Sequence, residues 1–370
     1  MNSPIRVGIV GVNAHRGWAA EAHIPALRAL PAYEIVALST TRQESADAAA
    51  AAFGIPLAFS DHRDLVTHPD VDLVVVAVKV MHHREIVTAA LEAGKSVYSE
   101  WPLGVDLDEA EAMVELAAKT GARTLVGLQS RSTPAVMHAG DLIAAGYLGT
   151  VVSTSLIVSA GLGGVTDQGN AYIIDRANGA GLLRLVAAHS IDVLNVLLGD
   201  FAELSAVLDT RRPMITVLET GETLVKTTPD QVAVIGRLET GVTASLHFRE
   251  GHQGGEMFLW EINGTEGTLQ LRAAGGHPGM FAVTLSGSQG VDGLAEIPIP
   301  HASTSIPGLD SLVNTTAHSL ARMYDAFATD LRNGSHNAPD FAQALATFRV
   351  SDAIEEAAAS GARVTLPKAN

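Results

Sequence analysis

The first third of the chain alternates short apolar runs with longer stretches of helical spacing. The apolar runs are IRVGIVGV, YEIVALST, VDLVVVAV, KSVYSE and RTLVGLQS. They lack the regular polar alternation of a strand with one solvated face, which predicts strands buried on both sides. Helical stretches separate them, and an Ala-rich one ends at Gly54, a residue type that favours a helix C-terminus. These features predict an α/β fold with a doubly wound parallel sheet.

The pattern of the remaining chain is different. A helical stretch at Pro134–Ala145 leads into longer runs, in which the sequences LETG and NGTEG predict hairpin turns. One apolar helix is expected over residues 179–199, and two more near the end at Ala317–Asn333 and Asp340–Ser360. This mixture predicts an α+β domain with a large, mostly antiparallel sheet.

We therefore expect two domains, one over residues 1–128 and one over residues 129–370. A chain of 370 residues, of which 47% are hydrophobic, is long enough to bury a core in each.

Charge and composition exclude several classes of partner and site. The chain carries 24 Lys and Arg against 40 Asp and Glu, a net charge of −16, which disfavours nucleic acid and anionic membranes. With no cysteine it can form neither disulfides nor thiolate metal sites. The first strand leaves no room for a signal peptide, and the longest aliphatic run, Leu73–Val78, is too short to cross a bilayer. We expect a soluble, cytoplasmic protein.

The turn after the first strand, in GIVGVNAHRGWA, carries candidate chemistry. Glycines there let backbone N–H groups approach a pyrophosphate at a helix N-terminus. Gly11 and Gly17 are present, but Asn13 stands where the middle glycine of the dinucleotide fingerprint belongs. Within the βαβ context we still expect a dinucleotide to contact this turn, at Gly11, Val12, Asn13, Gly17 and Trp18.

The end of the second strand distinguishes the two pyridine dinucleotides. An acid there binds the adenosine ribose of NAD, whereas a hydroxyl with an arginine accommodates the 2′-phosphate of NADP. The chain has Thr40, Thr41 and Arg42, with no acid before Glu44. The charge argument favours NADP over NAD. Alternatively, Thr40 caps the next helix and Arg42 is merely solvated.

Several stretches together resemble the Gfo/Idh/MocA oxidoreductase family: HIPALRAL, VDLVVVAV, EWPLG, VGLQSR, AAHSIDVL and INGTEGTLQL. The resemblance spans nearly the whole chain. It implies that residues 1–128 form a dinucleotide-binding Rossmann domain and residues 129–370 a substrate-binding and oligomerisation domain. It also implies an NAD(P) cofactor, a sugar or sugar derivative as substrate, and a homodimer or homotetramer, for which an open sheet face also argues.

Two polar residues of the family pattern are missing. Trp101 stands where the family has a lysine that touches the nicotinamide ribose, and Leu185 where it has an aspartate. His189 and Asp192 match the remaining polar positions. In these departures the chain resembles most the branch that contains the fungal galactose-regulon repressor, which works by nucleotide-responsive protein binding with no established turnover.

The resemblance and the position of strand ends imply further contacts. Loops at the carboxyl ends of parallel strands line the nucleotide crevice. The expected cofactor contacts there are Val78, Lys79, His83, Glu100, Trp101, Pro102 and Gln129. The expected substrate contacts are Trp101, Arg131, Tyr172, Arg176, Arg184 and His189. Trp101 either stacks on a ring of the ligand or fills the space of the lost lysine, and Arg184 either meets an anionic substituent or forms a surface salt bridge.

Three functions are consistent with these residues. Hydride removal from an alcohol requires a base, which His189 with Asp192 orienting it supplies in an NAD(P)-dependent oxidoreductase acting on a carbohydrate or polyol. The alternatives are a non-catalytic nucleotide-binding regulator and a glycosidase that uses NAD(P) transiently by oxidation and elimination. A two-histidine metal site at His82 and His83 is disfavoured, because neighbours in a strand point to opposite faces.

Overall fold

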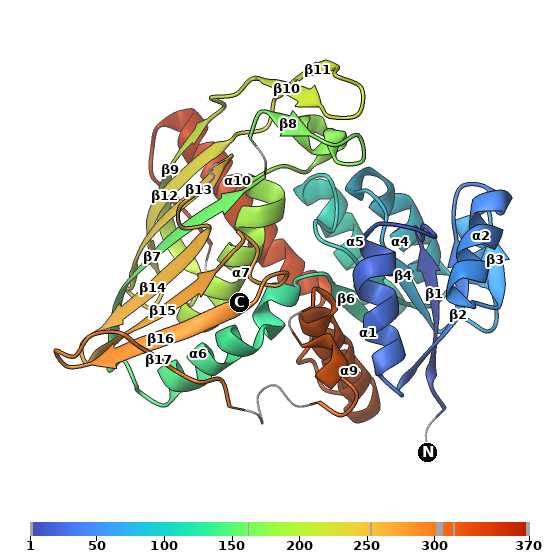
Figure 1. The fold of residues 1–370 in the computed structure, drawn as a ribbon, viewed down its shortest axis with the longest axis horizontal. Helices are drawn as coiled ribbons and strands as arrows, with labels where there is room; N and C mark the ends of the chain where they lie inside the picture. Colours follow the sequence, from blue (N-terminus) through green and yellow to red (C-terminus); the bar gives the residue numbers. More distant parts are fainter. Residues whose placement is uncertain (1–2, 162, 252–253, 301–305, 314, 368–370) are drawn as a thin grey trace. The chain divides into compact units, whose positions relative to one another are not determined.

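The computed structural model describes residues 3–161, 163–251, 254–300, 306–313 and 315–367. Its internal contacts divide the chain into two units (Figure 1). The first comprises Met1–Gln129 and Ser305–Leu345, and the second Ser130–Thr304 and Ala346–Asn370.

A six-stranded sheet forms the centre of the first unit, with all of its strand pairs parallel. Its order, β3-β2-β1-β4-β5-β6, is that of a Rossmann fold, which confirms the predicted doubly wound sheet. Every residue of β4 is buried, as its unbroken apolar run predicts. The strands are β1 (Ile5–Val10), β2 (Tyr33–Ser39), β3 (Leu57–Phe59), β4 (Leu73–Val76), β5 (Ser96–Ser99) and β6 (Thr124–Val126).

Local signals in the sequence account for the helices between these strands. Gly54, at φ 58°, ends the Ala-rich helix in the left-handed conformation that glycine favours. Asp61 and Asp106 begin two other helices by accepting hydrogen bonds from backbone N–H groups of the first turn. The helices are α1 (Ile24–Ala29), entered through the π-helical turn η1 (Ala19–His23), α2 (Gln43–Phe53), α3 (His62–Thr67), η2 (Val80–His82), α4 (His83–Glu92) and α5 (Leu107–Thr120).

Residues 305–345 belong with the first unit, which differs from the predicted boundary at residue 129. Their helix α9 (Ala317–Asn333), preceded by η7 (Asp310–Leu312), buries Tyr324 against Tyr98 of β5, with ring centroids 5.2 Å apart. The carboxylate of Asp330, in the last turn of α9, accepts hydrogen bonds from Ser335, Asn337 and Ala338. The sequence pattern reveals an apolar helix face, but it does not reveal which of two sheets that face covers.

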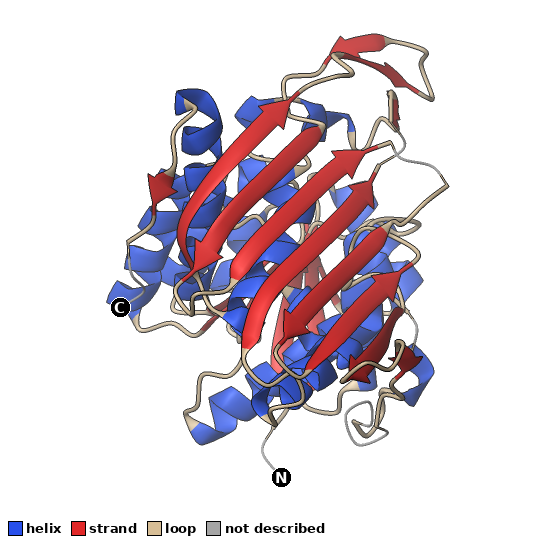
Figure 2. Ribbon diagram, turned by 90° about the vertical axis from the view of Figure 1, so that its left-hand side faces the viewer, coloured by secondary structure: helices blue, strands red, loops and turns tan. Residues whose placement is uncertain are grey.

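The second unit is built on a nine-stranded sheet of order β17-β16-β15-β14-β7-β13-β12-β9-β18 (Figure 2). Among the described strands of this sheet, β7 and β13 are the one pair that runs parallel, so the predicted mostly antiparallel sheet is confirmed. Both predicted hairpins are present, β12–β13 and β14–β15. The strands are β7 (Val151–Ala160), β9 (Phe201–Asp209), β12 (Gln231–Leu238), β13 (Thr243–Glu250), β14 (Phe258–Gly264), β15 (Gly267–Ala273), β16 (Val283–Gln289), β17 (Ala295–Glu296) and β18 (Val364–Thr365).

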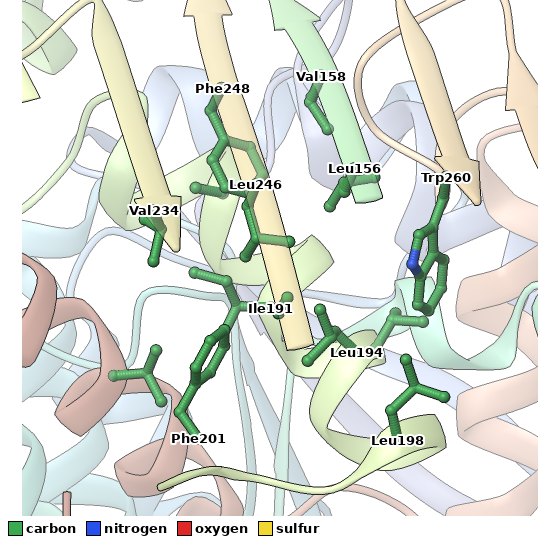
Figure 3. Close-up of a cluster of buried hydrophobic side chains, with 14 of the residues drawn as sticks. Leu156, Val158, Ile191, Leu194, Leu198, Phe201, Val234, Leu246, Phe248 and Trp260 are labelled. Atoms are coloured by element: carbon green, nitrogen blue, oxygen red, sulfur yellow. The ribbon is translucent and has the colours of Figure 1, made fainter. Parts of the chain in front are cut away.

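One face of this sheet packs on helix α7 (Ala188–Leu198), which continues η6 (Leu183–Ala187) (Figure 3). Ile191 and Leu194 meet sheet residues such as Phe248 and Trp260 in one buried cluster. The apolar segment Arg176–Leu198 is long enough to cross a bilayer, but 67% of its most apolar window is buried, as expected of a core helix.

Further elements of the second unit surround this core. A three-stranded sheet of order β11-β10-β8, which the sequence pattern did not predict, has β8 (Val165–Thr166), β10 (Met214–Val217) and β11 (Thr223–Val225). The remaining helical elements in the described part of the chain are η3 (Gln129–Ser132), α6 (Pro134–Ala144), η4 (Ala171–Ile174), η5 (Arg176–Asn178) and α10 (Phe341–Ser360). Of these, η3 and α10 begin in residues of the first unit and continue into the second.

Candidate functional site

A cavity of about 730 Å³ lies at the carboxyl edge of the parallel sheet in the first unit. In doubly wound sheets this edge is where ligands bind. The cavity is lined by Val10–His15, Ser39–Arg42, Ser45, Ala48, Ser60–Arg63, Val78, His82, Glu85 and Ile86.

Seven of the predicted cofactor residues line this cavity: Gly11, Val12, Asn13, Thr40, Thr41, Arg42 and Val78. The cavity also includes the segment Ser60–Arg63, which follows β3, and the residues His15 and Glu85, none of which was predicted from the sequence. The carboxyl ends of neighbouring parallel strands meet at one edge of the sheet, so the segment after β3 could have been predicted to line the same cavity.

The turn after β1 has little space for side chains. Gly11 has φ 102°, and a Cβ there would lie 2.6 Å from the carbonyl oxygen of Ala77. Asn13, in place of the middle glycine, accepts a hydrogen bond from the N–H of His15 at 2.9 Å and so folds the turn itself. The N–H of Gly17, at the entry to η1, donates to the carboxylate of Glu21 at 3.2 Å.

After β2, the hydroxyl of Thr40 forms hydrogen bonds within the chain, whereas the guanidinium of Arg42 has no carboxylate partner among the described residues. The hydroxyl of Thr40 donates to the carbonyl of Arg42 at 2.8 Å and contacts Ser45 Oγ at 2.7 Å, so it organises the start of α2. Across the cavity, Arg63 is paired with Glu85 at 2.6 Å and with Asp61 at 3.4 Å. The exposed guanidinium of Arg42 has no such carboxylate among the described residues.

Residues after β4 and β5 mainly hold loops together. His83 is buried, with Nδ1 2.9 Å from the carbonyl of Pro102 and Nε2 3.0 Å from that of Val78. Burial lowers the pKa of His83, and these hydrogen bonds only partly oppose it. His82 ends η2 and His83 opens α4, so the two histidines are not neighbours within a strand, and His82 but not His83 lines the cavity.

The EWPLG stretch is also largely internal. Trp101 is 5% exposed, and the Trp101–Pro102 peptide bond is cis. The carboxylate of Glu100 lies 2.8 Å from His23 Nε2, whose other ring nitrogen is 2.7 Å from the hydroxyl of Tyr324. Lys79 is exposed and precedes η2. None of Lys79, Glu100, Trp101 and Pro102 lines the cavity.

Among the described residues of the first unit, the buried polar atoms without a hydrogen-bond partner include the indole Nε1 of Trp18 and the amide oxygen of Gln129. Trp18 follows the glycine turn and Gln129 follows β6. A dinucleotide contains phosphate oxygens that accept hydrogen bonds and a carboxamide that donates them. The glycine turn, the cavity and these two atoms therefore fit a nicotinamide dinucleotide.

In the second unit, Asp192 on α7 is bound by Arg131. The Nε of Arg131 donates to Oδ2 of Asp192 at 3.0 Å, and a second guanidinium nitrogen bonds the other oxygen. Burial raises the pKa of Asp192, and Arg131 and Thr347 oppose this effect. The structure gives no hydrogen bond between Asp192 and His189, so the expectation that Asp192 orients His189 is wrong. The reason is that Arg131, from η3, takes both oxygens.

The neighbour of His189 is instead a second histidine, His277, which the sequence reasoning missed. Their ring centroids are 4.1 Å apart with the planes tilted by 56°. Nδ1 of His277 accepts a hydrogen bond from the N–H of Gly279 at 3.1 Å, and the hydroxyl of Thr133 donates one to the carbonyl of Pro278 at 3.0 Å. These two hydrogen bonds hold the loop of residues 277–279 in place. His189 is 6% exposed, and its Nδ1 has no hydrogen-bond partner in the described part of the chain. Burial and then His277 lower the pKa of His189 well below its usual value.

The other predicted substrate residues lie near the C-terminal helix or on the surface. Arg184 bonds Asp352, lies 3.1 Å from Glu355 and sits over the ring of Phe348, so its charge is balanced within the chain. Arg176 is exposed and pairs with Glu355 at 3.0 Å. Tyr172 is half-buried, and burial raises its pKa.

Sequence comparison identifies both parts of the chain. Residues 5–128 match the family described as "Oxidoreductase family, NAD-binding Rossmann fold", and residues 134–273 match "Gal80p, C-terminal domain". The dehydrogenase AclE of Aspergillus oryzae is 33% identical over 284 residues, which cover 73% of this chain and 77% of that protein.

The chain belongs to the Gfo/Idh/MocA oxidoreductase family.

Two further members of the family are informative. The galactose/lactose metabolism regulatory protein GAL80 of Saccharomyces cerevisiae is 30% identical over 74% of this chain and 68% of its own. Levoglucosan dehydrogenase of Pseudarthrobacter phenanthrenivorans is 27% identical, with 98% of both chains covered. A levoglucosan dehydrogenase structure in complex with NADH and L-sorbose superimposes with a TM-score of 0.84 at 25% identity, covering 98% of this chain and 99% of that one. The NAD-binding family match and the NADH complex of this neighbour thus support a nicotinamide cofactor for this Gfo/Idh/MocA chain.

The His189–His277 contact predicts a measurable shift of acidity. A His277→Phe variant keeps an aromatic ring at this position but removes the electrostatic effect of the imidazole, so the pKa of His189 rises. It stays below the ordinary value of about 6.5, because desolvation is the larger cause. Imidazole NMR signals followed against pH measure this change. The exposed His336, replaced by Phe, is the control, and an unchanged His189 pKa in His277→Phe would contradict the assignment.

Proposed function

We propose that the protein is an NAD(P)-dependent oxidoreductase that transfers a hydride between the nicotinamide and a carbohydrate or polyol, with His189 as the acid–base group. The observation that carries the proposal is a buried histidine, His189, whose pKa is lowered by desolvation and by His277, in a chain whose Rossmann unit has the cavity and glycine turn of a dinucleotide site. Levoglucosan dehydrogenase, similar along nearly its whole length, supports a sugar as the substrate class.

The residues divide the chemical work as follows. A bound nicotinamide supplies the hydride acceptor or donor. His189, neutral because it is desolvated, accepts the proton of the substrate hydroxyl in oxidation and returns it in reduction. The Arg131–Asp192 pair holds η3 against α7, which fixes the helix that carries His189. Trp101, in the position of the family lysine, supplies no proton, and Asp192 is bound by Arg131. Of the positions that match the family pattern, His189 is therefore the one assigned the acid–base step.

A non-catalytic, nucleotide-binding regulator is the second candidate. Residues 134–273 match the C-terminal domain of Gal80p, and the buried Trp101 replaces the family lysine. A regulator of this kind needs the nucleotide cavity but no acid–base group.

Turnover assays separate these functions from each other. The purified protein is incubated with NAD⁺ or NADP⁺ and a panel of sugars, sugar acids, polyols and aryl glycosides. We expect net nicotinamide reduction with at least one sugar or polyol, and a loss of about 10²–10⁴-fold in turnover for His189→Ala. Release of the aglycone without net reduction indicates the transient-oxidation glycosidase. Tight nucleotide binding without either reaction indicates the regulator, and turnover unaffected by His189→Ala removes that residue from the mechanism.

We infer a preference for NADP(H) from the cavity charges. Arg42 lines the cavity without a carboxylate partner among the described residues, and no acid follows β2 before Glu44. A 2′-phosphate would gain a charged hydrogen bond there. We expect Arg42→Ala to raise the KM for NADP(H) at least about tenfold and that for NAD(H) by much less. The exposed Arg237→Ala is the control, and equal effects on both nucleotides would exclude phosphate recognition.

We infer that a second copy of the chain covers the open face of the nine-stranded sheet. Val207 and Ile235 are 65% and 62% exposed on this face. Cross-strand pairing continues the row of Val207 through Ala233, His247 and Ile157, and Ile235 lies in the next row between Ser205 and Ser245. Sedimentation equilibrium should give a mass of two or four 38.5 kDa chains. Ile235→Asp should shift it toward the monomer, whereas Val291→Asp, on a fully exposed turn, should not. A monomeric wild type would refute the inference.

A further inference from the structure

The second unit contains another, smaller cavity of about 190 Å³. It lies where β8 and β10 of the three-stranded sheet meet η4 and the end of β13. Its apolar walls are formed by Val165, Ile173, Ile174 and Ile215. An engineered cavity of about 150 Å³ is known to hold a benzene molecule, so this one has room for a small organic molecule.

A buried ion pair, Lys226 and Glu250, forms the polar part of the wall. The side chain of Lys226 is 3% exposed and that of Glu250 is 15% exposed. The ammonium group donates to Oε2 of Glu250. Burial raises the pKa of Glu250, and this bond opposes the effect. The carboxyl of Glu250 therefore lies in surroundings that disfavour its charged form.

The hydrogen bonds of this pair are incomplete. An ammonium has three N–H donors, and the described residues supply one acceptor, Glu250. The other carboxylate oxygen of Glu250 has no donor among the described residues. A buried ion pair offsets its desolvation only when its remaining donors and acceptors are satisfied. The cavity is the space from which a bound molecule can satisfy them.

We propose that this cavity is a binding site for a small neutral molecule with adjacent hydroxyl groups, a sugar or polyol of about four or five carbons. A hydroxyl both accepts and donates, so two neighbouring hydroxyls serve the free N–H of Lys226 and the free oxygen of Glu250 together. The isoleucine walls suit the C–H face of such a molecule. A carboxylate ligand would be repelled by Glu250 and by Asp167, which also line the cavity.

This site shares no residue with the nucleotide cavity or with the pair His189–His277. It therefore does not rest on the proposed oxidoreductase activity.

The test measures binding to the cofactor-free protein. Erythritol, xylitol and, as an anionic probe, lactate are titrated and followed by saturation-transfer NMR and calorimetry. We expect saturable binding of a polyol, weakened at least about tenfold in the double variant Lys226→Met/Glu250→Leu. Replacing both partners by apolar residues of similar size preserves folding better than removing one. A second variant, Ile215→Trp, fills the cavity without touching the ion pair and should also abolish binding.

The matched control is the double variant Arg272→Met/Glu256→Leu, which replaces an exposed ion pair in the same unit. This variant should bind the polyol as the wild type does. Absence of polyol binding to the wild type, equal binding by the double variant, or a preference for lactate would each overturn the proposal. None of these results depends on nicotinamide turnover, so they are distinguishable from a failure of the proposed function.

Discussion

The close approach of the turn after β1 to the end of β4 is the constraint on which the nucleotide site depends. A side chain at residue 11 would lie 2.6 Å from the carbonyl oxygen of Ala77, and only glycine readily adopts the φ of 102° found there. Because residue 11 has no side chain, the backbone of this turn can pack closely against the segment after β4. The carboxyl ends of β1, β2, β3 and β4 can then surround one cavity. Everything proposed about cofactor, reaction and regulation presumes a dinucleotide in that cavity.

Features set by local patterns were predictable from the sequence. Unbroken apolar runs with helices between them gave the parallel sheet, and LETG and NGTEG gave the two hairpins. Features set by packing between distant segments were not. Nothing in the spacing of α9 indicates that Tyr324 stacks on Tyr98, and nothing near His189 indicates that a loop brings His277 against it.

The same distinction applies to the charges of the candidate site. The sequence identified His189, Asp192 and Arg131 but not their pairing, because a carboxylate bonds whichever donor the fold brings nearest. The fold brings Arg131 to Asp192, so the acidity of His189 is set by burial and by His277. A histidine in that environment remains neutral at pH 7, which is the form that a base requires. In the proposed mechanism His189 is therefore the acid–base group, in a chain that lacks the lysine and aspartate of the family pattern.

Calorimetric titration of the purified protein with NADH and NADPH tests the central claim most directly. We expect saturable binding of at least one of the two nucleotides, with one site per chain, and loss of that binding in a folded Gly11→Val variant. No binding of either nucleotide to the wild type, or unchanged binding by Gly11→Val, would contradict the assignment of the cavity.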